Sequence, residues 1–240
     1  MLLLSPPTQQ QTSEAAIAAL PCTSRVSGWL SPLAYGLAHY VVLPGYFGSL
    51  QITGQEHVPT TGPVILAPTH RSRWDSLVVP NSAGRRVTGR DVHFMVSANE
   101  ISGLQGWFIR RLGGFPVDTK HPGPSSFRHS VELLACDQTL VVFPEGDIFR
   151  DGTVHSLKSG LARMALHVQK TEQKAVQIVP IAIRYSDPVP HWRSQIQVKI
   201  GQPLSTANYA EQPPKAASRD LTTALHDRLS DLSQHLLPVQ

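Results

Sequence analysis

The residues of this chain best suited to acid–base chemistry are His70 and Asp75, within the segment Pro63–Val79 (PVILAPTHRSRWDSLVV). The apolar run Val64–Ala67 is short, partly β-branched and bounded by prolines, which predicts a buried strand. The chain is then expected to turn and enter a helix with Asp75 near its first turn. A bend between the two residues lets the carboxylate accept from one ring nitrogen of His70, which leaves the other nitrogen free as a base.

The same spacing occurs at His226 and Asp231, which serve as an internal comparison. There the surrounding sequence is a continuous amphipathic helix, in which five residues advance about 500° and the two side chains diverge. We therefore interpret this second pair as part of a solvated helix face. Spacing alone is a weak indication. What favours His70 as a base over a helix-capping histidine is its place after a strand, where α/β folds hold their active sites.

Glu145 repeats this arrangement, because it follows the apolar run Thr139–Phe143 in a turn that continues with Gly146. We expect it to line the same pocket as His70, since both would follow neighbouring strands of one sheet. The alternative is that it accepts backbone N–H groups and only shapes its loop. Gly146 lets the backbone approach a ligand closely, and Arg150 nearby is a candidate for binding phosphate.

The rest of the chain reads as alternating strands and helices. Further strands are expected at residues 92–96, 176–183 and 195–200, and helices at 103–112, 126–135, 156–170 and 218–236. Asn81–Arg90 reads as a polar loop, and Pro180 is typical of an edge strand or a bulge. With 240 residues and no repeats, the chain is predicted to form one α/β domain over residues 50–240, a single mixed sheet flanked by helices.

Two N-terminal segments are expected to precede this domain. Residues 1–25 read as a flexible leader that lacks the basic region of a signal peptide. Residues 26–49 belong to an uncharged, aromatic-rich stretch, which Pro32 and Pro44 divide into pieces shorter than the roughly 20 residues of a spanning helix. The prediction is a pair of short helices lying in one leaflet of a membrane. A core helix packed on the domain is the alternative.

The positive charge of the chain is concentrated beside the predicted site. The formal net charge is +4, and the segment Arg71–Lys120, with eight basic and four acidic residues, carries the same surplus. This distribution suits an anionic substrate, an acidic carrier protein or an anionic bilayer, and no nucleic-acid partner is expected. A solvated basic face is the alternative for any single arginine. The sequence shows no metal-ligand cluster, and no metal is expected.

Four sequence blocks together resemble the glycerolipid acyltransferases, specifically the 1-acylglycerol-3-phosphate acyltransferase group. They are His70–Asp75 (the HxxxxD motif of that family), Gly113–Asp118 (similar to its substrate-binding block), Phe143–Gly146 and Ile178–Ile181. The blocks occur in the expected order within about residues 50–205. One block would mean little, but four in register are specific, and they imply a fold like that of glycerol-3-phosphate acyltransferases.

The resemblance implies transfer of an acyl chain from coenzyme A or acyl carrier protein to the sn-2 hydroxyl of 1-acylglycerol-3-phosphate, giving phosphatidic acid. His70 would be the general base and Asp75 would orient it, with no cofactor beyond the thioester co-substrate. Glu145, Gly146 and Gly114 would bind substrate, and backbone N–H groups after His70 or at Gly146 are candidates for stabilising the oxyanion. The enzyme is expected at the cytoplasmic face of a membrane.

The chain departs from this family at three positions that usually carry cations. Thr119 and Ile148 stand where arginine is usual, and Ala98 stands where lysine is common. The expected substitutes are basic side chains long enough to reach a shared phosphate: Lys120, Arg150 and Arg73. The departures leave other functions open, namely an acyltransferase for another lysolipid, such as a lysophospholipid or lyso-ornithine lipid, a thioester hydrolase, or a non-catalytic membrane-binding module.

Overall fold

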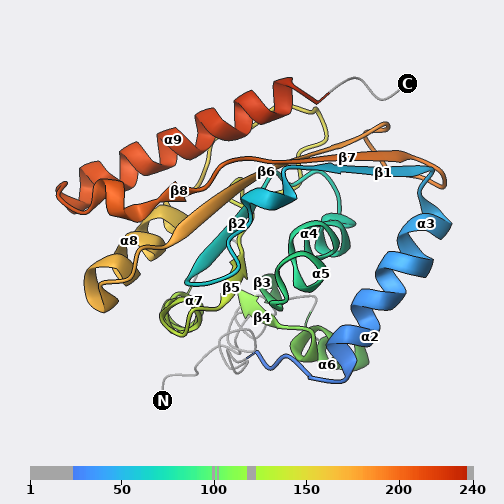
Figure 1. Cartoon of the computed structure of the whole chain (residues 1–240), viewed down its shortest axis with the longest axis horizontal. Helices are drawn as coiled ribbons and strands as arrows, with labels where there is room; N and C mark the ends of the chain where they lie inside the picture. Colours follow the sequence, from blue (N-terminus) through green and yellow to red (C-terminus); the bar gives the residue numbers. More distant parts are fainter. Residues whose placement is uncertain (1–23, 99–100, 102, 118–122, 237–240) are drawn as a thin grey trace, which may run out of the picture.

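The computed structural model describes residues 24–98, 101, 103–117 and 123–236. They form one eight-stranded sheet in the order β1-β7-β6-β2-β5-β3-β4, with the short β8 paired to β6 (Figure 1). The strands are β1 (Ser49–Thr53), β2 (Val64–Pro68), β3 (Val92–Ser97), β4 (Gly114–Val117), β5 (Thr139–Val141), β6 (Gln177–Tyr185), β7 (Gln195–Ile200) and β8 (Leu204–Ser205). The prediction of a single mixed sheet flanked by helices is confirmed. The predicted leader lies almost wholly outside the described residues.

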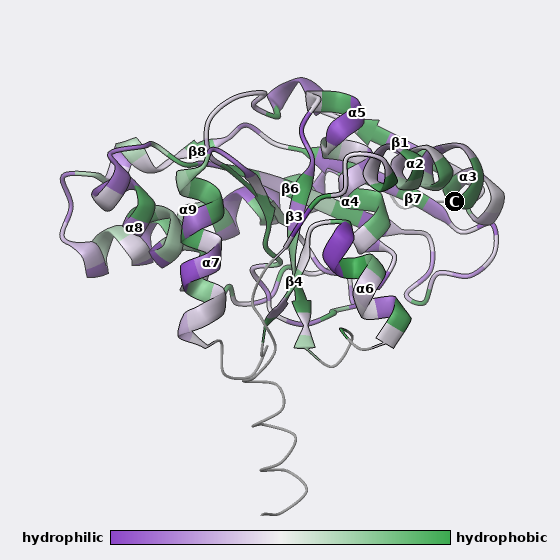
Figure 2. Cartoon of the chain, turned by 90° about the horizontal axis from the view of Figure 1, so that it is seen from below, coloured by the Kyte–Doolittle hydropathy of each residue, from purple (hydrophilic) through white to green (hydrophobic). Residues whose placement is uncertain are grey.

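Helices cover both faces of the sheet, and Figures 1 and 2 show α7, α8 and α9 on one side and α2 to α6 on the other. The α-helices are α2 (Leu30–Leu37), α3 (Leu43–Tyr46), α4 (Asp75–Ala83), α5 (Arg85–Thr88), α6 (Gly103–Arg111), α7 (Pro124–Ala135), α8 (Gly160–Glu172) and α9 (Pro214–Gln234). A π-helical turn, η1 (Ala38–Val42), and two 3₁₀ turns, η2 (Gln55–His57) and η4 (Thr206–Tyr209), complete the helical elements. The architecture is therefore a sandwich of helices, sheet and helices.

The sheet is apolar on both faces, because successive side chains of a strand point to opposite sides. In β2, Val64 and Leu66 pack into a cluster with Val79 of α4. Ile65 and Ala67 pack on the other face, in a cluster with residues of α7, α8 and α9. This two-sided burial explains why the sequence of β2 is a continuous apolar run rather than an alternating one.

Parallel pairing brings the ends of β2 and β5 to the same edge of the sheet. The two strands are neighbours, with Leu66 opposite Val141. His70 follows β2 and Glu145 follows β5, so the chain leaves the sheet at adjacent points before reaching either residue. The prediction that these two residues follow neighbouring strands is confirmed.

β6 is an interior strand, so the predicted edge position of Pro180 is wrong. The strand pairs with β2 along one side and with β7 and β8 along the other. Pro180 falls between the stretches paired with β8 and with β7, where its carbonyl accepts from Gly201 N at 2.9 Å. In a strand, the N–H and C=O of one residue point to the same side. The N–H that proline lacks would therefore point to the gap between the two paired stretches.

The predicted loop at Asn81–Arg90 is also wrong, because α4 continues to Ala83 and α5 follows directly. Two polar residues of this stretch, Asn81 and Ser82, are buried in α4 and not solvated. The side-chain oxygen of Asn81 lies 2.8 Å from His39 Nδ1, and Gln55 donates to the carbonyl of Ser82. Helix α9, which contains most of the helix predicted over residues 218–236, buries a stripe of leucines: Leu221, Leu225, Leu229, Leu232 and Leu236 just beyond it.

Residues 30–46 form one continuous helical segment, not two helices separated at the prolines. Pro32 lies in the first turn of α2, where a backbone N–H has no partner within the helix anyway. Pro44 follows η1, in which Leu43 N donates to Ala38 O, so the wider turn accommodates the proline. Leu43 and Phe47 are buried against the domain. The opposite face is exposed and apolar, with Trp29, Leu33, Leu37, Tyr40 and Val41.

Within the described part of the chain, no helix has both the length and the apolar character needed to cross a bilayer.

Candidate active site

The turn between β2 and α4 brings His70 and Asp75 together. Asp75 is the first residue of α4, and its Oδ2 lies 2.9 Å from Nδ1 of His70. An ionised carboxylate can only accept, so Nδ1 carries the ring proton and Nε2 presents its lone pair. Within the described residues no hydrogen bond occupies Nε2, and the His70 side chain is 20% exposed. The bend predicted from the sequence is thus confirmed, and it orients a basic nitrogen outward.

Both oxygens of the Asp75 carboxylate are held by protein donors. Oδ2 also accepts from the backbone N–H groups of Arg71 at 2.7 Å and Ser72 at 2.9 Å. Oδ1 accepts from the hydroxyl of Tyr185, on β6, at 2.7 Å. The carboxylate has no exposed surface. With every contact made to the ionised form, Asp75 is fixed as a negative partner for His70.

Glu145 stabilises the turn that carries His70 from the other side. Its Oε1 accepts from the backbone N–H of His70 at 3.1 Å, and its Oε2 accepts from that of His155 at 3.0 Å. Arg71 Nη1 lies 3.0 and 3.1 Å from the two oxygens, which makes a buried ion pair. Through these contacts the fully buried carboxylate of Glu145 stabilises its loop, and its predicted part in substrate binding stays a prediction.

Two further contacts fix the position of the His70 ring. The ring stacks on Phe143, with the ring centroids 4.0 Å apart and the planes at 24°. The preceding residue, Thr69, is fully buried and bonds β6 twice, donating its N–H to Ile181 O and accepting from Ile183 N. The Phe143–Gly146 block therefore supplies a platform for the imidazole as well as the brace at Glu145.

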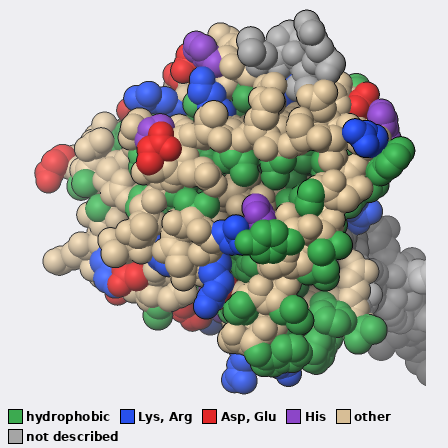
Figure 3. All heavy atoms as spheres, turned by 45° about the vertical axis from the view of Figure 1, so that its right-hand side comes forward, with side chains coloured by type: hydrophobic (Ala, Val, Ile, Leu, Met, Phe, Trp, Pro, Cys, Tyr) green, Lys and Arg blue, Asp and Glu red, His purple; other side chains and the backbone are tan. Residues whose placement is uncertain are grey.

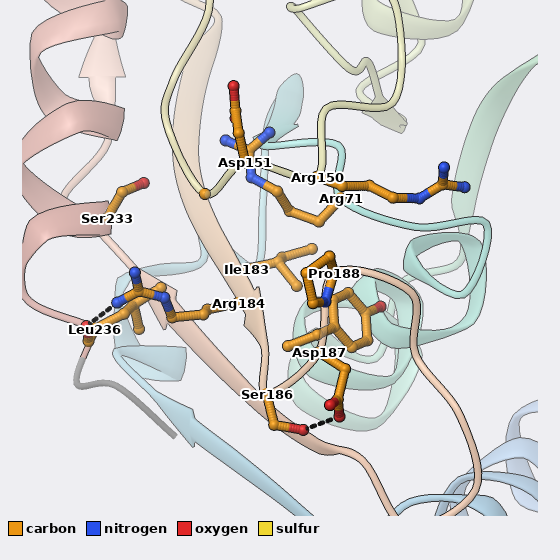
Figure 4. A pocket seen from close by; sticks show the side chains of 12 residues that line it. Arg71, Arg150, Asp151, Ile183, Arg184, Ser186, Asp187, Pro188, Ser233 and Leu236 are labelled. Carbon is orange, nitrogen blue, oxygen red and sulfur yellow. Dashed lines mark hydrogen bonds between the residues drawn. The ribbon is translucent and has the colours of Figure 1, made fainter. Parts of the chain in front are cut away.

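A cavity of about 210 Å³ opens beside the turn that carries His70 and Asp75, at the ends of β6 and α9 (Figure 4). Its lining includes Tyr185, whose hydroxyl holds Asp75, and Arg71 of the His70 turn. Arg184 donates a hydrogen bond to the carbonyl oxygen of Leu236, and Ser186 donates one to the carboxylate of Asp187, as Figure 4 shows. His70 is not among the described residues that line this cavity.

The structure describes two of the three cations that were predicted to bind phosphate. Arg73 is exposed in the turn between His70 and Asp75. Arg150 is exposed and lines the cavity beside Arg71. Lys120 lies outside the described residues, as does Thr119. Two of the three predicted substitutes thus lie on the segments that surround the His70 turn.

Glycine suits the two positions predicted to bind substrate for different structural reasons. Gly146 adopts φ +77°, a left-handed conformation that favours glycine, and it is exposed beside the side chain of Lys158. Gly114 is buried in β4, where a Cβ atom would lie 2.3 Å from the side chain of Ile109 in α6. Gly114 therefore allows close packing of helix and strand, and its predicted contact with substrate stays a prediction.

The backbone donors expected for an oxyanion are already engaged. The N–H groups of Arg71 and Ser72 bond Asp75, and that of Gly146 donates to Phe143 O at 3.2 Å. In this arrangement the three groups stabilise the turns and are not available to a substrate.

Sequence reasoning missed three residues that complete this site: Arg71, Phe143 and Tyr185. In the sequence, Arg71 was considered only as one of the basic residues concentrated beside the predicted site. Tyr185 lies beyond the last sequence block and reaches Asp75 only because β6 pairs with β2. Neither spacing nor composition carries a signal for that contact.

The sequence and the fold both match known acyltransferases. The family profile described as Acyltransferase matches residues 49–184, more than half of the chain, and the chain belongs to this family. It is 26% identical over 194 residues to a 1-acyl-sn-glycerol-3-phosphate acyltransferase of Bacillus subtilis, an alignment covering 79% of this chain and 90% of the relative. It is 24% identical over 170 residues to the enzyme of that name from Streptococcus pneumoniae, covering 65% and 58% of the two chains.

A solved structure shares the fold. The crystal structure of the 1-acyl-sn-glycerophosphate (LPA) acyltransferase PlsC from Thermotoga maritima aligns with a TM-score of 0.66 at 18% identity, covering 86% of this chain and 80% of that one. At this identity the likeness concerns the fold. The family assignment and the fold together establish an acyltransferase.

Proposed function

We propose that this acyltransferase moves an acyl chain from a thioester to the sn-2 hydroxyl of 1-acylglycerol-3-phosphate, giving phosphatidic acid. The observation that carries the proposal is the His70–Asp75 pair, in which the carboxylate fixes Nδ1 and leaves Nε2 for a substrate proton. The names of the two curated relatives support this acceptor.

His70 acts as the general base in this proposal. As the acceptor hydroxyl attacks the thioester carbonyl, its proton passes to Nε2, and Asp75 stabilises the imidazolium that forms. The new C–O bond replaces the C–S bond when the tetrahedral intermediate collapses. The proton then passes from His70 to the leaving thiolate, so the imidazole is neutral again. No covalent enzyme intermediate is required, because a thioester is already an activated acyl group.

The donor is a thioester of coenzyme A or acyl carrier protein, and the enzyme works at the cytoplasmic face of a membrane without a further cofactor. The exposed apolar face of residues 29–41 supports the membrane contact, since aromatic and aliphatic side chains on one side of a helix favour the bilayer interface. The cations Arg73, Arg150 and Lys120 bind the acceptor phosphate in this proposal.

Acceptor specificity tests the proposal. Purified protein is incubated with either thioester donor and with lysophosphatidate, lysophosphatidylcholine or monoacylglycerol, and the lipid products are identified by mass. We expect phosphatidic acid to form fastest. Equal rates with acceptors that lack a terminal phosphate, or release of free fatty acid without any acceptor, would contradict the proposal.

Arg150→Ala extends this test to the phosphate. We expect the KM for lysophosphatidate to rise about tenfold with little change in kcat, because the lost contact stabilises ground state and transition state alike. Arg219→Ala, which removes an exposed arginine from α9, is the matched control. An unchanged KM in the Arg150 variant would remove this residue from the acceptor site.

A further inference from the structure

Helix α6 turns its large apolar side chains outward. Leu104 is 75% exposed, and Trp107 and Phe108 are each 42% exposed. On its inner side Gly106 is buried against Ile101, where a Cβ atom would lie 2.8 Å from backbone. The helix thus has an apolar side, but that side faces away from the core. Such a face needs a partner outside the domain.

The C-terminal end of the same helix face is basic. Arg111 follows Leu104 by seven residues and Trp107 by four, so the three share one side of α6. Its guanidinium lies 4.6 Å from the centroid of the Trp107 ring. A cavity of about 350 Å³ opens here, which we call the arginine cavity. It is lined by Arg25, Val26, Ser27, Trp107, Arg110 and Arg111. None of these six described residues is acidic.

Backbone hydrogen bonds join this cavity to the start of α2. Arg25 N donates to Arg110 O at 3.2 Å, and Ser27 N donates to Arg111 O at 2.9 Å. The exposed face of α2, which begins at Trp29 and Leu33, is thereby held beside α6. Figure 3 shows apolar side chains gathered at the lower right of the molecule, with basic side chains at their lower margin. The two helices present one surface, apolar with a basic border.

We propose that the arginine cavity binds the phosphate headgroup of an anionic phospholipid while α6 and α2 lie in the bilayer interface. Guanidinium groups bind phosphate oxygens in pairs. The indole of Trp107 suits the depth of the headgroups, and Leu104 and Phe108 suit the acyl region below them. An apolar face bordered by arginines matches an anionic bilayer, which offers hydrocarbon and phosphate at adjacent depths. The inference deepens the proposed membrane contact and does not depend on the reaction.

Vesicle binding of the full chain tests this site. Binding is measured by sedimentation with vesicles of phosphatidylcholine alone and of phosphatidylcholine mixed with phosphatidylglycerol, at physiological ionic strength. We expect wild-type protein to prefer the mixed vesicles. Arg25→Gln/Arg111→Gln should weaken binding to mixed vesicles about 25-fold, since each basic residue near an anionic surface contributes about fivefold, and should leave binding to neutral vesicles unchanged.

The matched control is Arg219→Gln/Arg228→Gln, which removes the same charge from α9 on the opposite side of the molecule (Figure 1). It should bind both vesicles like wild type, and an equal loss in the two double variants would overturn the proposal. If wild-type protein bound both vesicle types equally, the headgroup site would be overturned, but the membrane contact would not. No binding to either vesicle would overturn the proposed membrane contact as well.

Conservative variants distinguish a specific headgroup-binding cavity from nonspecific electrostatic attraction to the membrane. Arg25→Lys/Arg111→Lys keeps the charge but loses the planar fork, and we expect binding to mixed vesicles to fall by about threefold or more. Leu104→Gln should weaken binding to both vesicle types, whereas Gln105→Asn, next to it on α6, should not. Wild-type affinity in the lysine variant, or no effect of Leu104→Gln, would contradict the proposed site. Thermal unfolding of each variant checks that it is folded.

Discussion

The Tyr185 hydroxyl donates a hydrogen bond of 2.7 Å to Oδ1 of Asp75, the carboxylate oxygen that His70 does not use. Burial, and next the negative charge of Asp75, raise the pKa of Tyr185 far above its usual range. The phenol therefore remains protonated, and so a hydrogen-bond donor, at neutral pH. This contact links β6 to the turn after β2 and holds the partner of the proposed base in one orientation.

Tyr185→Phe should slow the reaction without weakening substrate binding. The variant leaves a buried carboxylate oxygen without its donor, so we expect kcat to fall about tenfold with KM unchanged. Tyr209→Phe, on η4, is the control. A Tyr185 variant with wild-type kcat would show that the contact has no part in catalysis.

The Arg71–Glu145 pair should behave as a buried ion pair that is costly to break from one side. Glu145→Gln leaves the Arg71 charge without its partner, and we expect the free energy of unfolding to fall by about 3 kcal/mol. Arg71→Met/Glu145→Gln removes both charges and should cost less than the sum of the two single changes. Urea unfolding measures all three variants. Additive losses would mean that the two side chains do not act as a pair.

Local sequence patterns were sufficient to predict the elements that carry His70 and Asp75. The apolar run Val64–Ala67, the turn after it and the helix at Asp75 are all present, and the bend brings Asp75 to His70. Such features depend on residues close together in the chain, where strand length, β-branching and turn chemistry determine the outcome.

Contacts made across the sheet were not predictable in this way. Tyr185 reaches Asp75, and Arg71 reaches Glu145, only because parallel strands far apart in sequence become neighbours. The position of Pro180 in an interior strand likewise depends on where β7 ends and β8 begins. The helix over residues 103–112 was predicted, but the outward orientation of its apolar side chains was not, since a helical apolar pattern cannot distinguish a core from a bilayer.

The stability of the protein should fall as the solution becomes acidic, through His93. This side chain is buried beside His129, and burial first and then that neighbour lower the pKa of His93. The unfolded chain then binds more protons than the folded one. Stability is therefore complete above the ordinary histidine value of about 6.5 and is lost as the pH falls from there through the lowered pKa of the folded state.

Thermal unfolding between neutral and mildly acidic pH measures this effect. We expect the midpoint for wild-type protein to drop with pH, and that for His93→Gln to drop less steeply. His235→Gln, which changes an exposed histidine after α9, should follow the wild-type curve. Identical slopes for the His93 variant and wild type would exclude His93 as the titrating group.

In the proposed mechanism the imidazole of His70 takes the proton of the acceptor hydroxyl. The decisive measurement is the turnover of His70→Ala with saturating thioester and lysophosphatidate, beside His226→Ala, which removes the histidine of the same spacing on α9. We expect a loss of about 10³-fold for His70→Ala with an unchanged unfolding midpoint, and wild-type turnover for His226→Ala. Near-normal turnover of a folded His70→Ala enzyme would contradict the mechanism.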